Sequence, residues 1–128
     1  MCHPNSVCTN PGLVDRFGRQ VSYLRVSVTD RCDLRCSYCL PKGFDGYAEP
    51  TDWLNFAELE RVVGAFARMG VTRVRLTGGE PLLRRNIVDL VGNLAAIDGV
   101  HDLSLSTNAT QLGKYAPALK AAGLARVN

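Results

Sequence analysis

Apolar and polar residues alternate in four short segments, which begin near Tyr23, Arg73, Asp102 and Arg126. A two-residue period is typical of a strand that has one apolar and one polar face. Three longer segments carry apolar residues at helical spacing, and they span about 55–69, 86–97 and 112–122. Because strands and helices alternate, we expect a parallel sheet joined by right-handed crossovers. An antiparallel sheet with one solvated face is the alternative, but the intervening helices argue against it.

The ends of the expected helices are marked in the sequence. Asn55 is followed three residues later by Glu58, which is the pattern of a capping box, and Gly70 follows the last residue of this helix. Gly99 and Gly123 mark the ends of the second and third helices in the same way. The segment 43–53 is rich in Gly, Pro and Asp, and we expect an irregular, flexible flap there.

The polar faces of the expected strands carry information about the fold. In the first strand Leu24, Val26 and Val28 share one face, whereas Arg25 and Ser27 lie on the other. A parallel strand that is buried on both faces is apolar throughout, and these strands are not. Helices would cover the apolar faces, and the polar faces would line a concave surface suited to a charged ligand. The sequence therefore predicts an α/β fold, a partial (β/α) barrel that stops after about three βα units.

Composition narrows the class of protein. The 128 residues are 46% hydrophobic and 21% charged with a net charge of +3, which is ordinary for one soluble domain. The arginines are scattered, so we expect no nucleic-acid partner, and the polar first dozen residues resemble neither a signal peptide nor a membrane span. We expect a cytoplasmic protein with a flexible tail over 1–14 and one domain over 15–128. We also expect this truncated fragment to be inactive alone.

Three of the five cysteines have the spacing C-x-x-x-C-x-x-C, at Cys32, Cys36 and Cys39. An odd number of cysteines without secretory features favours thiols or metal ligands over disulfides. Three thiolates that hold a 4Fe-4S cluster leave one iron open to a ligand. The alternative is a structural zinc site, which needs four ligands and would require Cys2, His3 or Cys8 to fold back.

Two further motifs directly follow expected strands. Gly78-Gly79-Glu80-Pro81 follows the second strand and Asn108 follows the third, as the cysteine loop follows the first. Ligands of parallel α/β folds gather at the carboxyl ends of the strands, so we expect these loops to share one rim. The glycines would let the backbone approach a ligand, and Glu80 would receive an ammonium group. Alternatively, Glu80 is only a favourable charge at a helix start.

The motifs resemble those of a known superfamily. Residues 32–39 (CDLRCSYC) together with 78–81 (GGEP) resemble the radical S-adenosylmethionine superfamily. Within it, residues 15–19, 23–32 and 75–85 resemble the MoaA family, the GTP 3',8-cyclases that start molybdenum cofactor biosynthesis. The resemblance runs from about residue 15 to 128 and corresponds to the amino-terminal part of a family member.

The resemblance implies a cofactor set and a reaction. Cys32, Cys36 and Cys39 would hold the 4Fe-4S cluster, whose open iron would bind S-adenosylmethionine. One electron from an electron donor would cleave the cofactor to methionine and a 5'-deoxyadenosyl radical, which would start the cyclisation of GTP. A homodimer is expected for the full-length protein.

The resemblance also implies roles for particular residues. S-adenosylmethionine-binding positions match Tyr38 and Gly79, which lies beside Gly78 and Glu80. GTP-binding positions match Arg25, Arg75 and Ser106, and all three fall on the polar strand faces.

Other readings of the same residues stay open. Arg25 and Arg75 could form ion pairs between strands, Tyr38 could pack under its loop, and Arg84-Arg85 could be a surface pair rather than a phosphate clamp. Residues 106–109 read STNA where the family usually has TTNG, and the family's carboxy-terminal cysteines and Gly-Gly tail are absent. Another radical enzyme, such as a peptide-maturing one, or a zinc-binding module remains the alternative.

Overall fold

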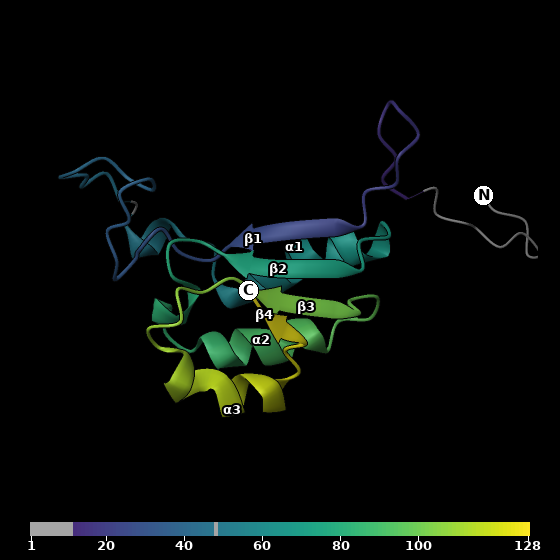
Figure 1. The fold of residues 1–128 in the computed structure, drawn as a ribbon. Coiled ribbons are helices and arrows are strands. Elements are labelled where there is room, and N and C mark those ends of the chain that lie inside the picture. Colours follow the sequence, from purple (N-terminus) through teal and green to yellow (C-terminus); the bar gives the residue numbers. More distant parts are fainter. Residues whose placement is uncertain (1–11, 48) are drawn as a thin grey trace, which may run out of the picture.

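The computed structural model describes residues 12–47 and 49–128 as a parallel sheet with helices between its strands (Figure 1). In chain order the elements are β1 Tyr23–Ser27, α1 Phe56–Arg68, β2 Arg73–Thr77, α2 Ile87–Ala95, β3 Asp102–Leu105, α3 Leu112–Ala122 and β4 Arg126–Val127. Two short 3-10 helices, η1 Pro50–Asp52 and η2 Pro81–Leu83, precede α1 and α2. The predicted order of strands and helices is confirmed.

The sheet has the strand order β1-β2-β3-β4, and each neighbouring pair is parallel. The antiparallel alternative is therefore wrong for these strands. Arg25 lies opposite Arg75, and Arg75 lies opposite Ser104, so equivalent positions of successive strands form rows across the sheet. Because the register is in step, the carboxyl ends of the strands reach the same edge, and segment 28–47 extends beyond that edge (Figure 1).

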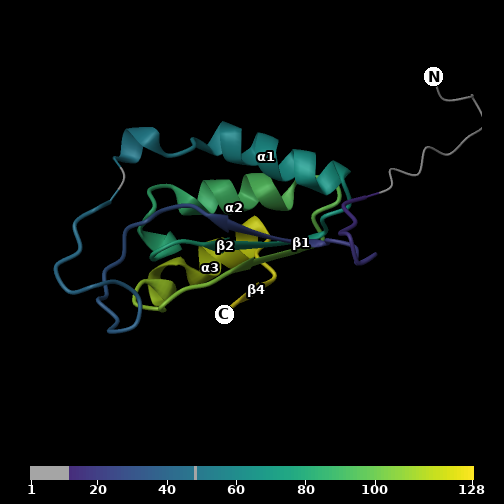
Figure 2. The ribbon, with the colours of Figure 1, turned by 90° about the horizontal axis from the view of Figure 1, so that it is seen from above.

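Burial confirms the predicted two faces of the strands. Val74, Leu76, Leu103 and Leu105 are buried, and they pack with apolar residues of the helices in one hydrophobic core. Figure 2 shows α1 and α2 on the same side of β1 and β2. On the other face Tyr23, Arg25, Ser27 and Arg73 are exposed. Helices thus cover the apolar face, and the polar face is open along β1, whereas Ser104 on the polar face of β3 is buried.

Two residues that precede the expected boundary at residue 15 contact the rest of the structure. Leu13 donates a backbone hydrogen bond to Met69 and packs against the core, and Val14 pairs with Gln20 in an isolated antiparallel bridge. The rest of the expected tail, with Cys2, His3 and Cys8, lies outside the described residues. Among the described residues of segment 43–53, η1 is the one helical element and there is no strand.

No helix within residues 12–47 and 49–128 combines the length and the apolar character needed to cross a bilayer.

The capping box of α1 gives a testable prediction. Asn55 Oδ1 accepts from the backbone N–H of Glu58 at 2.9 Å, and Glu58 Oε2 accepts from the N–H of Asn55 at 2.7 Å. Asn55→Ala removes one of these bonds and is expected to lower the free energy of unfolding by about 1 kcal/mol. Gln111 precedes α3 without a side-chain capping bond, so Gln111→Ala is the matched control. Equal losses for both variants in urea denaturation would contradict the role of the box.

Candidate functional site

The three cysteines of the spaced motif border the same cavities. Cys32, Cys36 and Cys39 are free thiols. All three line a cavity of about 300 Å³ together with Gly78 and Gly79. They also line a second cavity of about 250 Å³ with Tyr38, Glu80 and Ser106 among its other residues. The loops after the three strands therefore do share one rim, as the sequence predicted.

The thiols that line the cavities are the donor type of an iron-sulfur cluster, in which each cysteine binds a different iron. Among residues 12–47 and 49–128, no three Cys, His, Asp or Glu side chains are placed to hold one ion. Desolvation raises the pKa of the Cys39 thiol most, and the charge of the neighbouring Cys36 raises it further. Since the ligand form is the thiolate, binding of a metal would have to displace that proton.

The glycine pair is explained by contact between two loops. A Cβ atom on Gly78 would overlap the carbonyl oxygen of Thr29, and one on Gly79 would overlap that of Arg31. The absence of side chains lets Gly79 N–H donate to Thr29 at 2.9 Å and Glu80 N–H donate to Arg31 at 2.7 Å. The glycines therefore hold the cysteine loop against the loop after β2, a reason that the sequence did not show.

Glu80 is a buried carboxylate that accepts three hydrogen bonds. It is 1% exposed. Its Oε1 accepts from Leu82 N–H at 3.1 Å and from Thr107 Oγ1 at 2.7 Å, and its Oε2 accepts from Asn108 N–H at 2.7 Å. Glu80 caps the short 3-10 helix η2, whereas α2 begins only at Ile87. A carboxylate has about four acceptor positions, so its expected contact with an ammonium group remains a proposal.

The loop after β3 reaches back to the cysteine loop through Asn108. Its Nδ2 donates to Asp33 Oδ1 at 2.7 Å and lies 3.9 Å from Cys32 Sγ. Thr110 Oγ1 donates to the other oxygen of Asp33. The hydrogen bond from Thr110 lowers the pKa of Asp33 most, and the hydrogen bond from Asn108 lowers it further. The cysteine loop is thus tied to both neighbouring loops.

Tyr38 does not pack under its loop. Its side chain is 88% exposed and lies at the edge of the smaller cavity. A hydrogen bond with Cys36, followed by the charges of Cys36 and Cys39, raises the pKa of Tyr38. A ligand in this cavity would therefore meet a phenol in its neutral form, with the ring free to cover it.

The arginines predicted to bind substrate lie on the polar face of the sheet. Arg25 and Arg75 are opposite each other in the register, and Arg75 Nε is 3.4 Å from Ser104 Oγ. Within the described part of the chain neither arginine forms a salt bridge, so the ion-pair alternative is not supported. Neither lines the cavities beside the cysteines, whereas Ser106 lines the smaller one. The two arginines therefore lie together on the sheet, whereas Ser106 lies apart from them, at the smaller cavity beside the cysteines.

The chain is similar in sequence to a family profile and to several known proteins. Residues 26–128 match the profile of the radical SAM superfamily. The chain is 47% identical over 117 residues to the GTP 3',8-cyclase of Hydrogenovibrio crunogenus, and 49% identical over 118 residues to that of Erythrobacter litoralis. Each alignment covers 91% of this chain and 35% of the relative. The chain thus spans about a third of the length of these curated relatives.

Two solved structures share the fold. A structure of BtrN in an open conformation has a TM-score of 0.65 at 23% identity, over 85% of this chain and 49% of that one. BtrN in complex with AdoMet and 2-DOIA has a TM-score of 0.63 at 22% identity, over 85% and 45%. This likeness supports the predicted partial barrel.

The contact around Gly79 gives a second prediction. Gly79→Ala is expected to lower the free energy of unfolding by about 1–3 kcal/mol, because the new methyl group meets rigid backbone. Gly113 in α3 has open space around it, so Gly113→Ala is expected to raise stability by up to about 1 kcal/mol. Both variants are measured by urea denaturation. A stabilised Gly79→Ala variant would contradict the proposed contact between the loops.

Ala109 gives a third prediction, because it stands where the resembled family usually has glycine. Its φ of +67° lies in the left-handed region, so the turn is kept despite the side chain. Ala109→Gly is expected to raise the free energy of unfolding by about 1 kcal/mol. The exposed Ala121 in α3 is the control, since Ala121→Gly should cost about 1 kcal/mol. A loss at both positions in thermal melting would disprove the strain.

Proposed function

Since this chain belongs to the radical SAM superfamily, we propose that it is the amino-terminal part of a GTP 3',8-cyclase of molybdenum cofactor biosynthesis. The main support is its identity to GTP 3',8-cyclases, 47% in one case, over 91% of its length. The paired Arg25 and Arg75 support it further, since a radical enzyme for an uncharged substrate has no evident use for two adjacent arginines.

The three cysteines would hold a 4Fe-4S cluster, and residues around the smaller cavity would hold S-adenosylmethionine. When bound, these groups would supply one-electron cleavage chemistry. Tyr38 would lie against the cofactor, and the backbone of Gly78 and Gly79 would line its site. Glu80 would contribute its remaining acceptor position to an ammonium group while its other bonds fix the loops.

Substrate binding would use the polar face of the sheet. Guanidinium groups stay charged and donate in a fork that matches phosphate oxygens, so Arg25 and Arg75 would bind the triphosphate of GTP. Ser106 would contact the substrate from the rim, where its loop also borders the cysteines. This arrangement would place the phosphates on the strands and the sugar near the cofactor.

The proposal carries expectations about partners and location. A one-electron donor is needed, and a homodimer is expected for the full-length protein. Neither nucleic acid nor a membrane is required. Three cysteines that serve as thiolate ligands need a reducing compartment, so we propose a cytoplasmic location.

A hybrid enzyme tests the proposal. The matched segment of the Moorella thermoacetica GTP 3',8-cyclase, which is 49% identical over 114 residues, is replaced by that of this chain. The hybrid is expected to bind GTP and to cyclise it. Arg25→Ala and Arg75→Ala together should weaken GTP binding by at least about tenfold, measured by calorimetry, because each removes charged hydrogen bonds.

Arg61→Ala is the control, because Arg61 is an exposed arginine of α1 away from the polar face. GTP affinity that is unchanged by the double substitution would reject the cyclase assignment. Cleavage of S-adenosylmethionine without GTP binding would instead favour another radical enzyme, such as a peptide-maturing one.

A further inference from the structure

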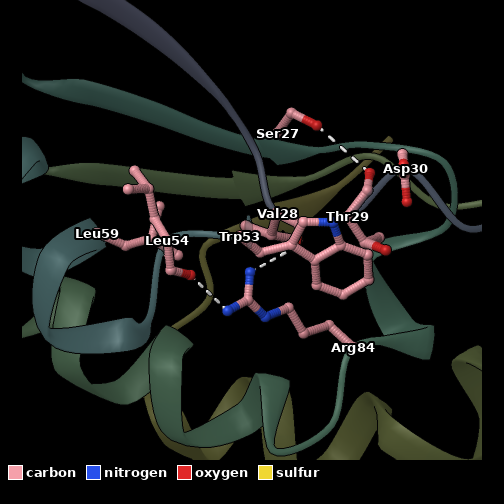
Figure 3. A pocket seen from close by; sticks show the side chains of 8 residues that line it. All are labelled: Ser27, Val28, Thr29, Asp30, Trp53, Leu54, Leu59 and Arg84. Atoms are coloured by element: carbon pink, nitrogen blue, oxygen red, sulfur yellow. Dashed lines mark hydrogen bonds between the residues drawn. The ribbon is translucent and has the colours of Figure 1, made fainter. Parts of the chain in front are cut away.

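Arg84 joins three segments that are distant in the sequence. It follows η2 and directs its guanidinium toward the carboxyl end of β1 (Figure 3). Nη1 donates to the Val28 carbonyl at 2.7 Å, and Nη2 donates to the Leu54 carbonyl at 2.6 Å. One side chain thus connects the end of β1, the start of α1 and the loop after β2.

Aromatic rings complete the surroundings of Arg84. Its Cζ atom lies 5.4 Å from the ring centroid of Trp53 and 5.0 Å from that of Phe56. Within the described residues it forms no salt bridge, and burial lowers its pKa. A planar, weakly hydrated guanidinium suits a site of carbonyl oxygens and ring faces, whereas an ammonium group can reach only part of it.

Direct packing between these segments is incomplete. A cavity of about 200 Å³ lies among them, and it is lined by Trp53, Leu54, Leu59, Arg84 and residues 27–30 (Figure 3). Val28 is 2% exposed, and β1 is an edge strand. A buried carbonyl oxygen needs a donor, and Arg84 supplies one to Val28.

We propose that Arg84 is a positioning residue that fastens the segment 53–56 to the end of β1 and so fixes the start of the cysteine loop. Val28 is held from two sides, because its N–H donates to Thr77 at 3.0 Å and its carbonyl accepts from Arg84. The cysteine loop begins four residues later, at Cys32. The effect on metal binding rests on the proposed function, whereas the fastening itself does not.

Hydrogen exchange and fluorescence test the fastening in the metal-free chain. Trp53 is the only tryptophan in the sequence, so its emission reports on this contact alone. Arg84→Ala is expected to shift the emission to longer wavelength and to speed exchange of the amides in 28–32 and 53–56 by at least about tenfold. Arg85 is exposed and carries the same charge, so Arg85→Ala is the matched control and should change neither signal.

Arg84→Lys covers the case in which Arg84→Ala does not fold. It keeps the charge and the alkyl stem but cannot donate to both carbonyls, so it should also speed exchange in both segments. Exchange and emission that match those of Arg85→Ala, in whichever Arg84 variant folds, would overturn the proposal.

Iron binding tests the consequence for the cysteine loop. After anaerobic reconstitution, Arg84→Ala or Arg84→Lys is expected to bind iron about tenfold more weakly than Arg85→Ala does. Equal iron binding would overturn the role of Arg84 in positioning the cysteines, even with faster exchange. Absence of iron from the unsubstituted chain would instead reject the proposed function, and the exchange comparison would still decide the fastening.

Discussion

The arrangement of the site depends on Glu80, where three loops meet. Its backbone N–H donates to the cysteine loop at Arg31, and its side chain accepts from Thr107 and Asn108 in the loop after β3. The carboxylate is buried, so removing any of these donors would leave an unsatisfied group at considerable cost. This meeting of three loops at Glu80, here called the Glu80 node, requires Gly78 and Gly79, because any side chain there would overlap the backbone of the cysteine loop.

This node explains why a parallel sheet suits the proposed chemistry. The strands supply rigid rows of polar residues, such as Arg25 and Arg75, on the face that the helices leave open. The loops supply the cysteines at the adjoining edge. Beyond the last paired residues of the strands, hydrogen bonds between the loops hold them in place. Arg84 extends the same principle to the contact between the end of β1 and the start of α1, where its guanidinium donates to the Val28 and Leu54 carbonyls.

Much of this could be predicted from the sequence, because local patterns determine it. The third helix has the predicted bounds, Leu112–Ala122, and the capping box at Asn55 forms as expected. The bonds of Glu80 and Arg84 could not be predicted, since their partners lie 27 and 56 residues away and several of those partners are backbone atoms. A carbonyl oxygen belongs to every residue, so no sequence pattern marks it. Ala109 gives no signal for a left-handed turn for a related reason, because alanine seldom adopts one.

The most direct test of the account is the metal content of the chain after anaerobic reconstitution with iron and sulfide. The account predicts a brown protein whose iron and sulfide are lost when Cys32, Cys36 and Cys39 are each replaced by alanine. It also predicts that S-adenosylmethionine changes the electron paramagnetic resonance spectrum of the reduced protein, because one iron is open to a ligand. A colourless protein that binds zinc through these cysteines would contradict it.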